Sequence, residues 1–163
     1  MKALGPVTGI IAAAATGGAL LGFGVRAGTP SRPFNGIATL VLGDQARGVW
    51  GYVGTVTVTG ILLHVAIMTG WGMLFVALSA RRRGWQVPAL AAAVSSVAWL
   101  VSKAVVLRQM GAGMSSVLGS GQLVLLHVVL AVALVLGMRF ARSGSTRDRS
   151  YRDSSAGASA QAP

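Results

Sequence analysis

The two histidines of this chain, His64 and His127, lie in apolar stretches long enough to cross a lipid bilayer. No aspartate or glutamate accompanies them in those stretches. Neutral imidazole is a common axial ligand of haem iron, and helix bundles place such ligands on facing helices. One hypothesis is therefore a b-type haem held between His64 and His127. The alternatives are contact with a quinone, and interhelical hydrogen bonds, which contribute on average about 0.6 kcal/mol in membrane proteins.

The spacing of the two histidines allows them to lie at a similar depth in a membrane. His64 follows Tyr52 by twelve residues, and His127 follows Ser116 by eleven. Tyr52 and Ser116 mark the same side of their apolar segments, because segments two and four run in the same direction. The match in depth depends on how far the long second segment tilts.

Lys103 is the one lysine inside an apolar segment, and Ser96 and Trp99 share its helical face. One interpretation is that its stem lies in apolar surroundings while the ammonium reaches the lipid head groups. The other is an inward-facing cation near the histidines, able to bind an anionic head group or a haem propionate. Lys103 is therefore a candidate binding residue together with His64 and His127.

The residues that carry most enzyme chemistry are absent. Cysteine does not occur, which excludes disulfides, thiolate metal sites and covalently attached c-type haem. Asp44 is the only acid before residue 143, so a carboxylate proton relay is not expected. No serine–histidine–aspartate set, metal-ligand cluster or phosphate-binding glycine loop is found. We therefore predict no catalytic residues and no metal site.

Composition indicates that the surroundings of this chain are lipid. Of its 163 residues, 53% are hydrophobic and 10% are charged, and the mean hydropathy is +0.69. A typical soluble domain has about 25% charged residues, and a chain this short cannot hide so much apolar surface. The net charge of +11 comes from basic residues that flank apolar segments. This pattern is typical of membrane topology signals, so nucleic acid is not an expected partner.

Four apolar segments predict an all-α membrane protein with a four-transmembrane-helix bundle. They span about residues 4–25, 53–80, 87–107 and 117–138. Each has about 20 or more residues, enough to cross the ~30 Å hydrocarbon core as a helix. Residues 1–142 therefore form one transmembrane domain. Residues 143–163 have almost no apolar side chains and predict a disordered cytoplasmic tail.

The first segment loosely resembles a secretory signal peptide, with Lys2 before an apolar run and Arg26 after it. The apolar run is long for such a peptide, and no small-x-small cleavage site precedes Arg26. We expect the segment to be retained as a span. Cleavage would leave three spans.

The connection over residues 26–52 predicts a short helix in the membrane interface. Phe34, Ile37 and Val41 fall at helical spacing after two prolines. Trp50 and Tyr52 would then anchor the second span at the level of the head groups.

The distribution of arginine and lysine predicts that both termini are cytoplasmic. An arginine-rich, Ala- and Gly-rich composition points to a bacterial inner membrane. Arg81, Arg82 and Arg83 form a short turn that serves as a topology signal or contacts lipid head groups. The side that contains this turn carries nine basic residues: Lys2, Arg81, Arg82, Arg83, Arg139, Arg142, Arg147, Arg149 and Arg152. The other side carries Arg26, Arg32, Arg47 and Arg108, with Lys103 just inside the span.

Glycine spacing predicts close helix packing. The glycines concerned are Gly9, Gly17, Gly18, Gly22 and Gly60. Small residues four apart let helices approach closely, within one chain or between chains. With little catalytic chemistry, the sequence favours a structural or accessory subunit that packs against a larger membrane complex or against itself. The alternative is an electron-transfer bundle that binds haem b or a quinone through His64 and His127.

Overall fold

The computed structural model describes the backbone of residues 3–106 and 118–159, and the side chains of residues 3–104 and 118–143. These residues form helices and connections, with no strand among them. The helices are α1 (Leu4–Arg26), α2 (Arg32–Leu42), α3 (Asp44–Arg47), α4 (Gly54–Ser79), α5 (Gln86–Val101) and α8 (Ser120–Ser159), and a π-helical turn, η1 (Ser102–Val106), follows α5.

Four of these helices are long and apolar enough to cross a membrane: Leu4–Arg26, Gly54–Ser79, Gln86–Ala104 and Ser120–Ser143. The predicted all-helical architecture with four candidate spans is therefore confirmed. The predicted end of the third span, at 107, and the predicted start of the fourth, at 117, lie outside the described residues.

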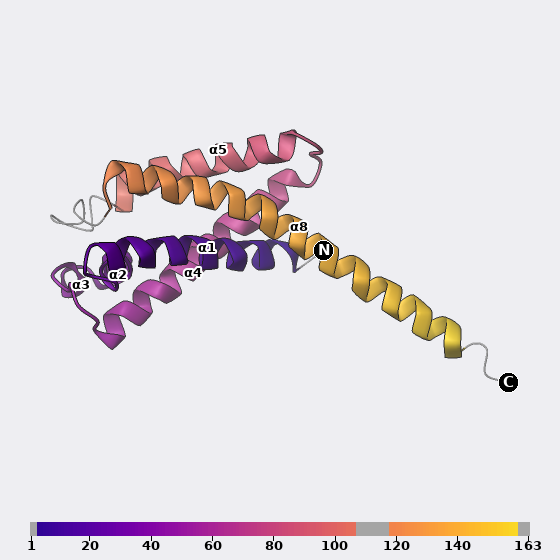
Figure 1. The fold of residues 1–163 in the computed structure, drawn as a ribbon, viewed down its shortest axis with the longest axis horizontal. Helices are drawn as coiled ribbons and strands as arrows, with labels where there is room; N and C mark the ends of the chain where they lie inside the picture. Colours follow the sequence, from indigo (N-terminus) through magenta and orange to yellow (C-terminus); the bar gives the residue numbers. More distant parts are fainter. Residues whose placement is uncertain (1–2, 107–117, 160–163) are drawn as a thin grey trace.

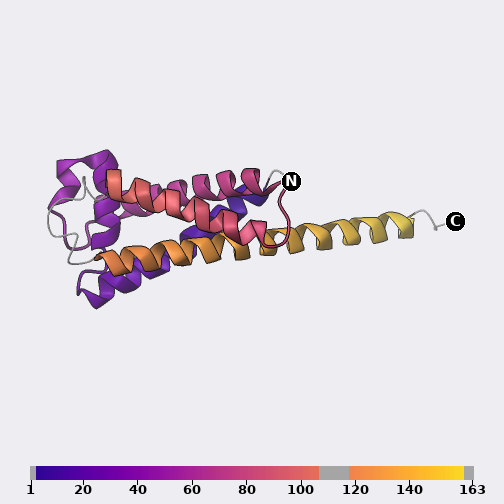
Figure 2. The ribbon, with the colours of Figure 1, turned by 90° about the horizontal axis from the view of Figure 1, so that it is seen from above.

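The four long helices form a bundle in which α1 packs against both α4 and α8 (Figure 1). Helix α5 packs mainly against α8, and α2 packs across α4. Helices α2 and α3 lie together at one end of the bundle, called the loop end below. The N-terminus and the turn over residues 80–85 lie at the opposite end, called the tail end (Figures 1 and 2).

The core has two main clusters of buried side chains. The larger joins α1, α4, α5 and α8 around Phe75, Leu134 and Met138. The smaller lies nearer the loop end, where Leu20, Phe34 and Ile37 meet Leu118. Outside these clusters the helices expose many large apolar side chains, among them Leu62, Leu100 and Val132. An apolar exterior of this kind suits lipid surroundings rather than water.

Helix α2 begins at Arg32, with Pro33 in its first turn, and ends where Gly43 adopts a φ of 55°. Proline suits this position because the N–H groups of the first turn have no acceptor within the helix, so proline loses no hydrogen bond there. The residues from Arg32 to Thr39 are buried, so α2 forms part of the packed bundle. Its location at a membrane interface stays a prediction.

Helix α8 continues to Ser159 and extends past the tail end (Figure 2). This differs from the sequence-based prediction of a disordered tail over residues 143–163. Residues 143–159 contain no proline, and adding residues to a helix that already exists avoids the cost of nucleation. Residues 160–163 lie outside the described part of the chain.

Candidate functional site

His64 is buried between α4 and α1, with 5% of its surface exposed. Its Nε2 lies 3.1 Å from Thr16 Oγ1 and 3.2 Å from the Ala13 carbonyl oxygen. The Thr16 hydroxyl donates its proton to the Ala12 carbonyl at 2.7 Å. Both contacts of Nε2 are therefore acceptors, so Nε2 carries the proton. Nδ1 is then an acceptor, and no described residue hydrogen-bonds to it.

His127 shows the complementary arrangement on α8. Its Nδ1 lies 2.7 Å from the carbonyl oxygen of Leu123, one turn earlier. A carbonyl only accepts, so Nδ1 donates and Nε2 is left as the acceptor. The backbone carbonyl of His127 accepts a hydrogen bond from the Ser95 hydroxyl, which ties α8 to α5.

The two histidines line the same cavity, but the cavity does not fit a haem. Its volume is about 90 Å³, and most of its wall is apolar. Pockets for small organic ligands have volumes of about 300 Å³ or more. The Nε2 of His64 faces α1 as a donor instead of facing His127 as a ligand. Both predicted histidines therefore line one cavity, but this cavity is too small to hold a haem.

Lys103 does not lie with the histidines. Its side chain is exposed, and its Nζ lies 4.8 Å from the centroid of the Trp99 ring. A cation at this distance from an indole face is stabilised by the ring quadrupole. The structure therefore agrees with an outward-facing lysine on the face that Trp99 shares.

A much larger cavity, of about 750 Å³, lies between α1 and α4 and reaches the loop end. Its wall is mainly apolar. Gly17 and Gly18 form part of it on α1, and Ile61 and His64 on α4. Sequence reasoning missed this cavity. The signal was the pair of small residues on α1, which leaves space opposite the side chains of α4.

Arg32 is a second feature that sequence reasoning missed. Its guanidinium is buried, lies 4.7 Å from the centroid of Trp50, and donates to the carbonyls of Arg47 and Val49, each at 3.1 Å. Burial lowers the pKa of Arg32 below its ordinary value. An arginine still keeps its charge at neutral pH, so this cation holds the 47–50 segment against α2.

Asn35 completes this network. Its Nδ2 donates to the carbonyls of Val49, at 3.1 Å, and Gly51, at 2.8 Å. Its Oδ1 accepts from the Thr57 hydroxyl at 2.7 Å. One buried amide thus joins α2, the loop and α4. An arginine and an asparagine at the start of an otherwise apolar helix were the available signals.

The predicted packing glycines fall into two groups. A Cβ on Gly9 would meet the backbone of Thr69 on α4, and a Cβ on Gly60 would meet the carbonyl of Phe34 on α2. Gly17 faces His64, with 3.5 Å from the position of a Cβ to Nε2. Gly18 and Gly22 have no atom within 4 Å of that position, so they do not pack inside the chain.

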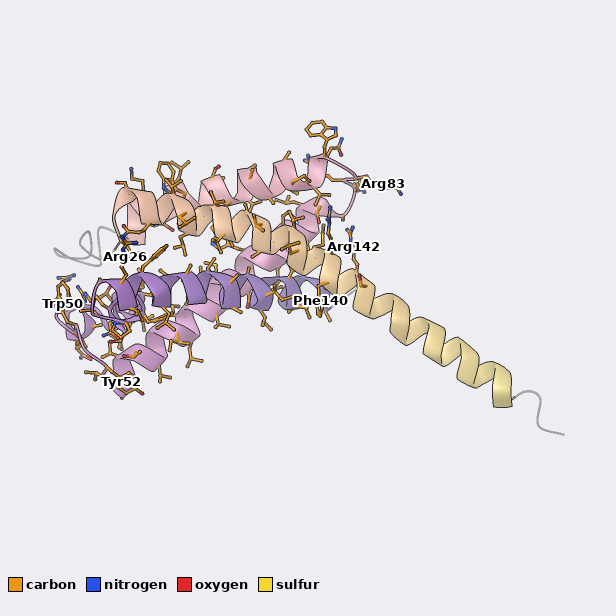
Figure 3. The ribbon with its side chains drawn as sticks, viewed as in Figure 1. Arg26, Trp50, Tyr52, Arg83, Phe140 and Arg142 are labelled. Carbon is orange, nitrogen blue, oxygen red and sulfur yellow. The ribbon has the colours of Figure 1, made fainter. Side chains whose placement is uncertain are left out.

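The basic turn over residues 81–83 lies at the end of the bundle opposite to Trp50 and Tyr52. Figure 3 shows Arg83 and Arg142 toward the tail end, and Arg26, Trp50 and Tyr52 at the loop end. Arg81, Arg82 and Arg83 are all exposed. Among the described residues, no group of three or more metal-ligating side chains is found.

Comparisons with protein-family models, with curated proteins and with solved structures gave no match. The class of this protein therefore rests on its own architecture. That architecture is an all-helical bundle with four helices of the length and composition of membrane spans.

Proposed function

We propose that this chain is a multi-pass protein of a bacterial inner membrane that serves as a structural or accessory subunit. It packs against a larger membrane complex or against a second copy of itself. The observation that carries this proposal is an unused small-residue seam on α1, formed by Ala14, Gly18 and Gly22. These residues lie four apart, and all three are exposed.

The seam differs from the side of α1 that packs inside the chain. Gly9 and Thr16 contact α4, whereas Gly18 and Gly22 have open space where a Cβ would be. Small residues four apart let a second helix approach until the backbones touch, which is a main source of helix association in lipid. The interior adds support, because Nε2 of His64, the Thr16 hydroxyl and the Asn35 amide all make contacts between helices of this chain.

Copurification from native membranes tests the proposal. A tagged chain in mild detergent should retain a second copy, detected with a second tag, or a partner protein at constant stoichiometry. Gly22→Ile should lose that partner, because its side chain separates the helices at the seam. Gly70→Ile is the matched control, since Gly70 on α4 also has open space around it. A wild-type chain that is monomeric and has no stoichiometric partner would overturn the proposal.

The proposed orientation places the tail end, with the 81–83 turn and both termini, in the cytoplasm. Its support is the excess of basic residues on that side of the four spans. A C-terminal tag should resist protease in spheroplasts and become sensitive after lysis. Digestion in intact spheroplasts would reverse the orientation.

A further inference from the structure

We infer that the cavity between α1 and α4 binds one acyl chain of an anionic phospholipid, whose head group lies at the loop end. This rests on the membrane location proposed above. The cavity shares Ala14 and Gly18 with the small-residue seam of α1, but not Gly22. The cavity has about 750 Å³, within the range of pockets that bind small molecules.

The length of the cavity matches one leaflet of a bilayer. On α1 it reaches from Ile10 to Leu21, which is about 16 Å along a helix axis. Half of the hydrocarbon core is about 15 Å. The cavity therefore extends from near the middle of the bundle to the loop end, the depth that the chain of one lipid occupies.

The cavity is open to the surroundings of the bundle. Several of its lining residues, including Ile10, Leu21 and Ile61, also count among the exposed large apolar side chains. Exposed positions in the middle of a span face lipid. An occupant therefore enters sideways from the bilayer, which favours a membrane lipid over a water-soluble ligand.

The end of the cavity nearest the loops is polar and aromatic, as a head-group region requires. Trp50 and Tyr52 line it there, and both residue types prefer the interface between membrane and water. Arg26, at the end of α1, is exposed and lies three residues before Thr29 of the cavity wall. Figure 3 shows Arg26, Trp50 and Tyr52 at this same end.

The charge at the loop end of the bundle favours an anionic head group. Asp44 is the only acidic residue among the described side chains, and it is paired with Arg47 at 2.5 Å. Arg26 and the buried Arg32 thus leave the loop end with uncompensated positive charge. A basic residue at the membrane surface attracts anionic lipids.

Filling the cavity tests the inference. Ile61→Trp places a large side chain in the cavity from α4, while Leu62→Trp is a matched control on the lipid-facing side of the same helix. The proteins are extracted, washed in detergent and analysed by native mass spectrometry. Wild type and Leu62→Trp should retain about one phospholipid per chain, and Ile61→Trp roughly tenfold less, because its indole takes the place of the chain. Equal retention in both variants would overturn the inference.

Two further measurements separate loss of lipid binding from unfolding and from loss of the partner. The thermal unfolding midpoint of Ile61→Trp should match that of Leu62→Trp, and retention is compared at a temperature where both are folded. Ala14 and Gly18 of the seam also line the cavity, whereas Gly22 does not. Gly22→Ile should therefore lose the partner and keep the phospholipid, so that failure of lipid binding and failure of the accessory role are distinguishable.

The head group is tested with Arg26→Gln, and Arg83→Gln at the tail end is its control. Delipidated proteins are offered phosphatidylglycerol or phosphatidylcholine in mixed micelles. Arg26→Gln should lower the preference for phosphatidylglycerol roughly fivefold, the scale of one basic residue at an anionic surface. An equal preference in both variants would overturn the anionic assignment. A retained prenylquinone that is lost in Ile61→Trp would overturn the phospholipid and assign the cavity to a redox lipid near His64.

Discussion

The hydroxyl of Thr57 donates to Oδ1 of Asn35 at 2.7 Å, and both side chains are buried. This bond joins α4, a candidate span, to α2, which belongs to the connection between two spans. Asn35 also holds the loop carbonyls of Val49 and Gly51. The loop end is therefore a packed part of the bundle. It also supplies part of the wall of the large cavity, including Trp50, Gly51 and Thr57.

Removal of the Thr57 hydroxyl should destabilise the loop end. In Thr57→Val, Oδ1 of Asn35 loses its donor inside the protein, and the backbone N–H of Val53 loses the hydroxyl oxygen that accepts from it at 3.4 Å. The expected cost is about 1–3 kcal/mol. Thr59→Val is the matched control, because the Thr59 hydroxyl donates only to the carbonyl of Thr55 in its own helix. Chemical unfolding in detergent measures the difference. Equal stability of the two variants would show that the bonds of the Thr57 hydroxyl to Asn35 and Val53 contribute nothing.

A methyl group at Gly60 should disrupt the packing of α2 on α4. The Cβ of Gly60→Ala would overlap the carbonyl of Phe34, and backbone atoms cannot move aside as a flexible side chain does. We expect a loss of about 1–3 kcal/mol, the usual scale of overpacking. Gly70→Ala has open space and should leave the unfolding midpoint unchanged or slightly raised. Accumulation in membranes and thermal unfolding check this pair. A Gly60→Ala protein as stable as Gly70→Ala would contradict the close contact.

The purified protein should show no Soret band, and adding haem should not create one that depends on His64. The physical reason is that Nε2 of His64 carries a proton toward Thr16 and Ala13, and that the cavity shared with His127 is about 90 Å³. Oxidised and reduced absorption spectra give the measurement. A sharp reduced band that disappears in His64→Ala would establish the bis-histidine haem instead.

The substitution Arg32→Lys should destabilise the loop end, although it keeps the positive charge. The planar guanidinium stacks on Trp50 while it donates to two loop carbonyls, and an ammonium cannot reproduce both contacts. Arg32→Lys should cost about 1–3 kcal/mol through the unsatisfied carbonyls. Proteolysis of the 43–53 loop should accelerate accordingly. Arg47→Lys is the comparison, since Arg47 pairs with Asp44 at an exposed site where ion pairs contribute little. Identical cleavage rates in the two variants would rule out a role for Arg32 in holding the loop.

The number and place of the candidate spans could be predicted because they depend on local composition. A run of about 20 apolar residues has to form a helix in lipid, whatever it contacts. The predicted spans at 4–25 and 53–80 differ from α1 and α4 by at most one residue at each end. The tail was harder to predict, because its polar composition does not prevent a helix from continuing once α8 has formed.

The candidate site could be predicted only in part. The sequence identified His64 and His127 as the unusual polar residues, but not which ring nitrogen each would use or which helix His64 would face. It named Gly18 and Gly22 together with Gly9 and Gly60, although only the last two lie at close backbone contacts. Spacing along one helix does not tell which of its faces meets another helix.

By itself, the sequence determined an all-helical chain with four helices long and apolar enough to cross a membrane, few polar residues within them, and basic residues at their ends. These properties follow from the solvation of each segment separately. Only the tertiary structure decided that His64 would donate to α1, that Arg32 and Asn35 would bind the loop, and that a cavity would open between α1 and α4. Such features depend on the rotation and crossing of helices that are distant in the sequence. The crossing angles are set by how the surfaces of two helices pack together, so they cannot be derived from the sequence of one segment alone.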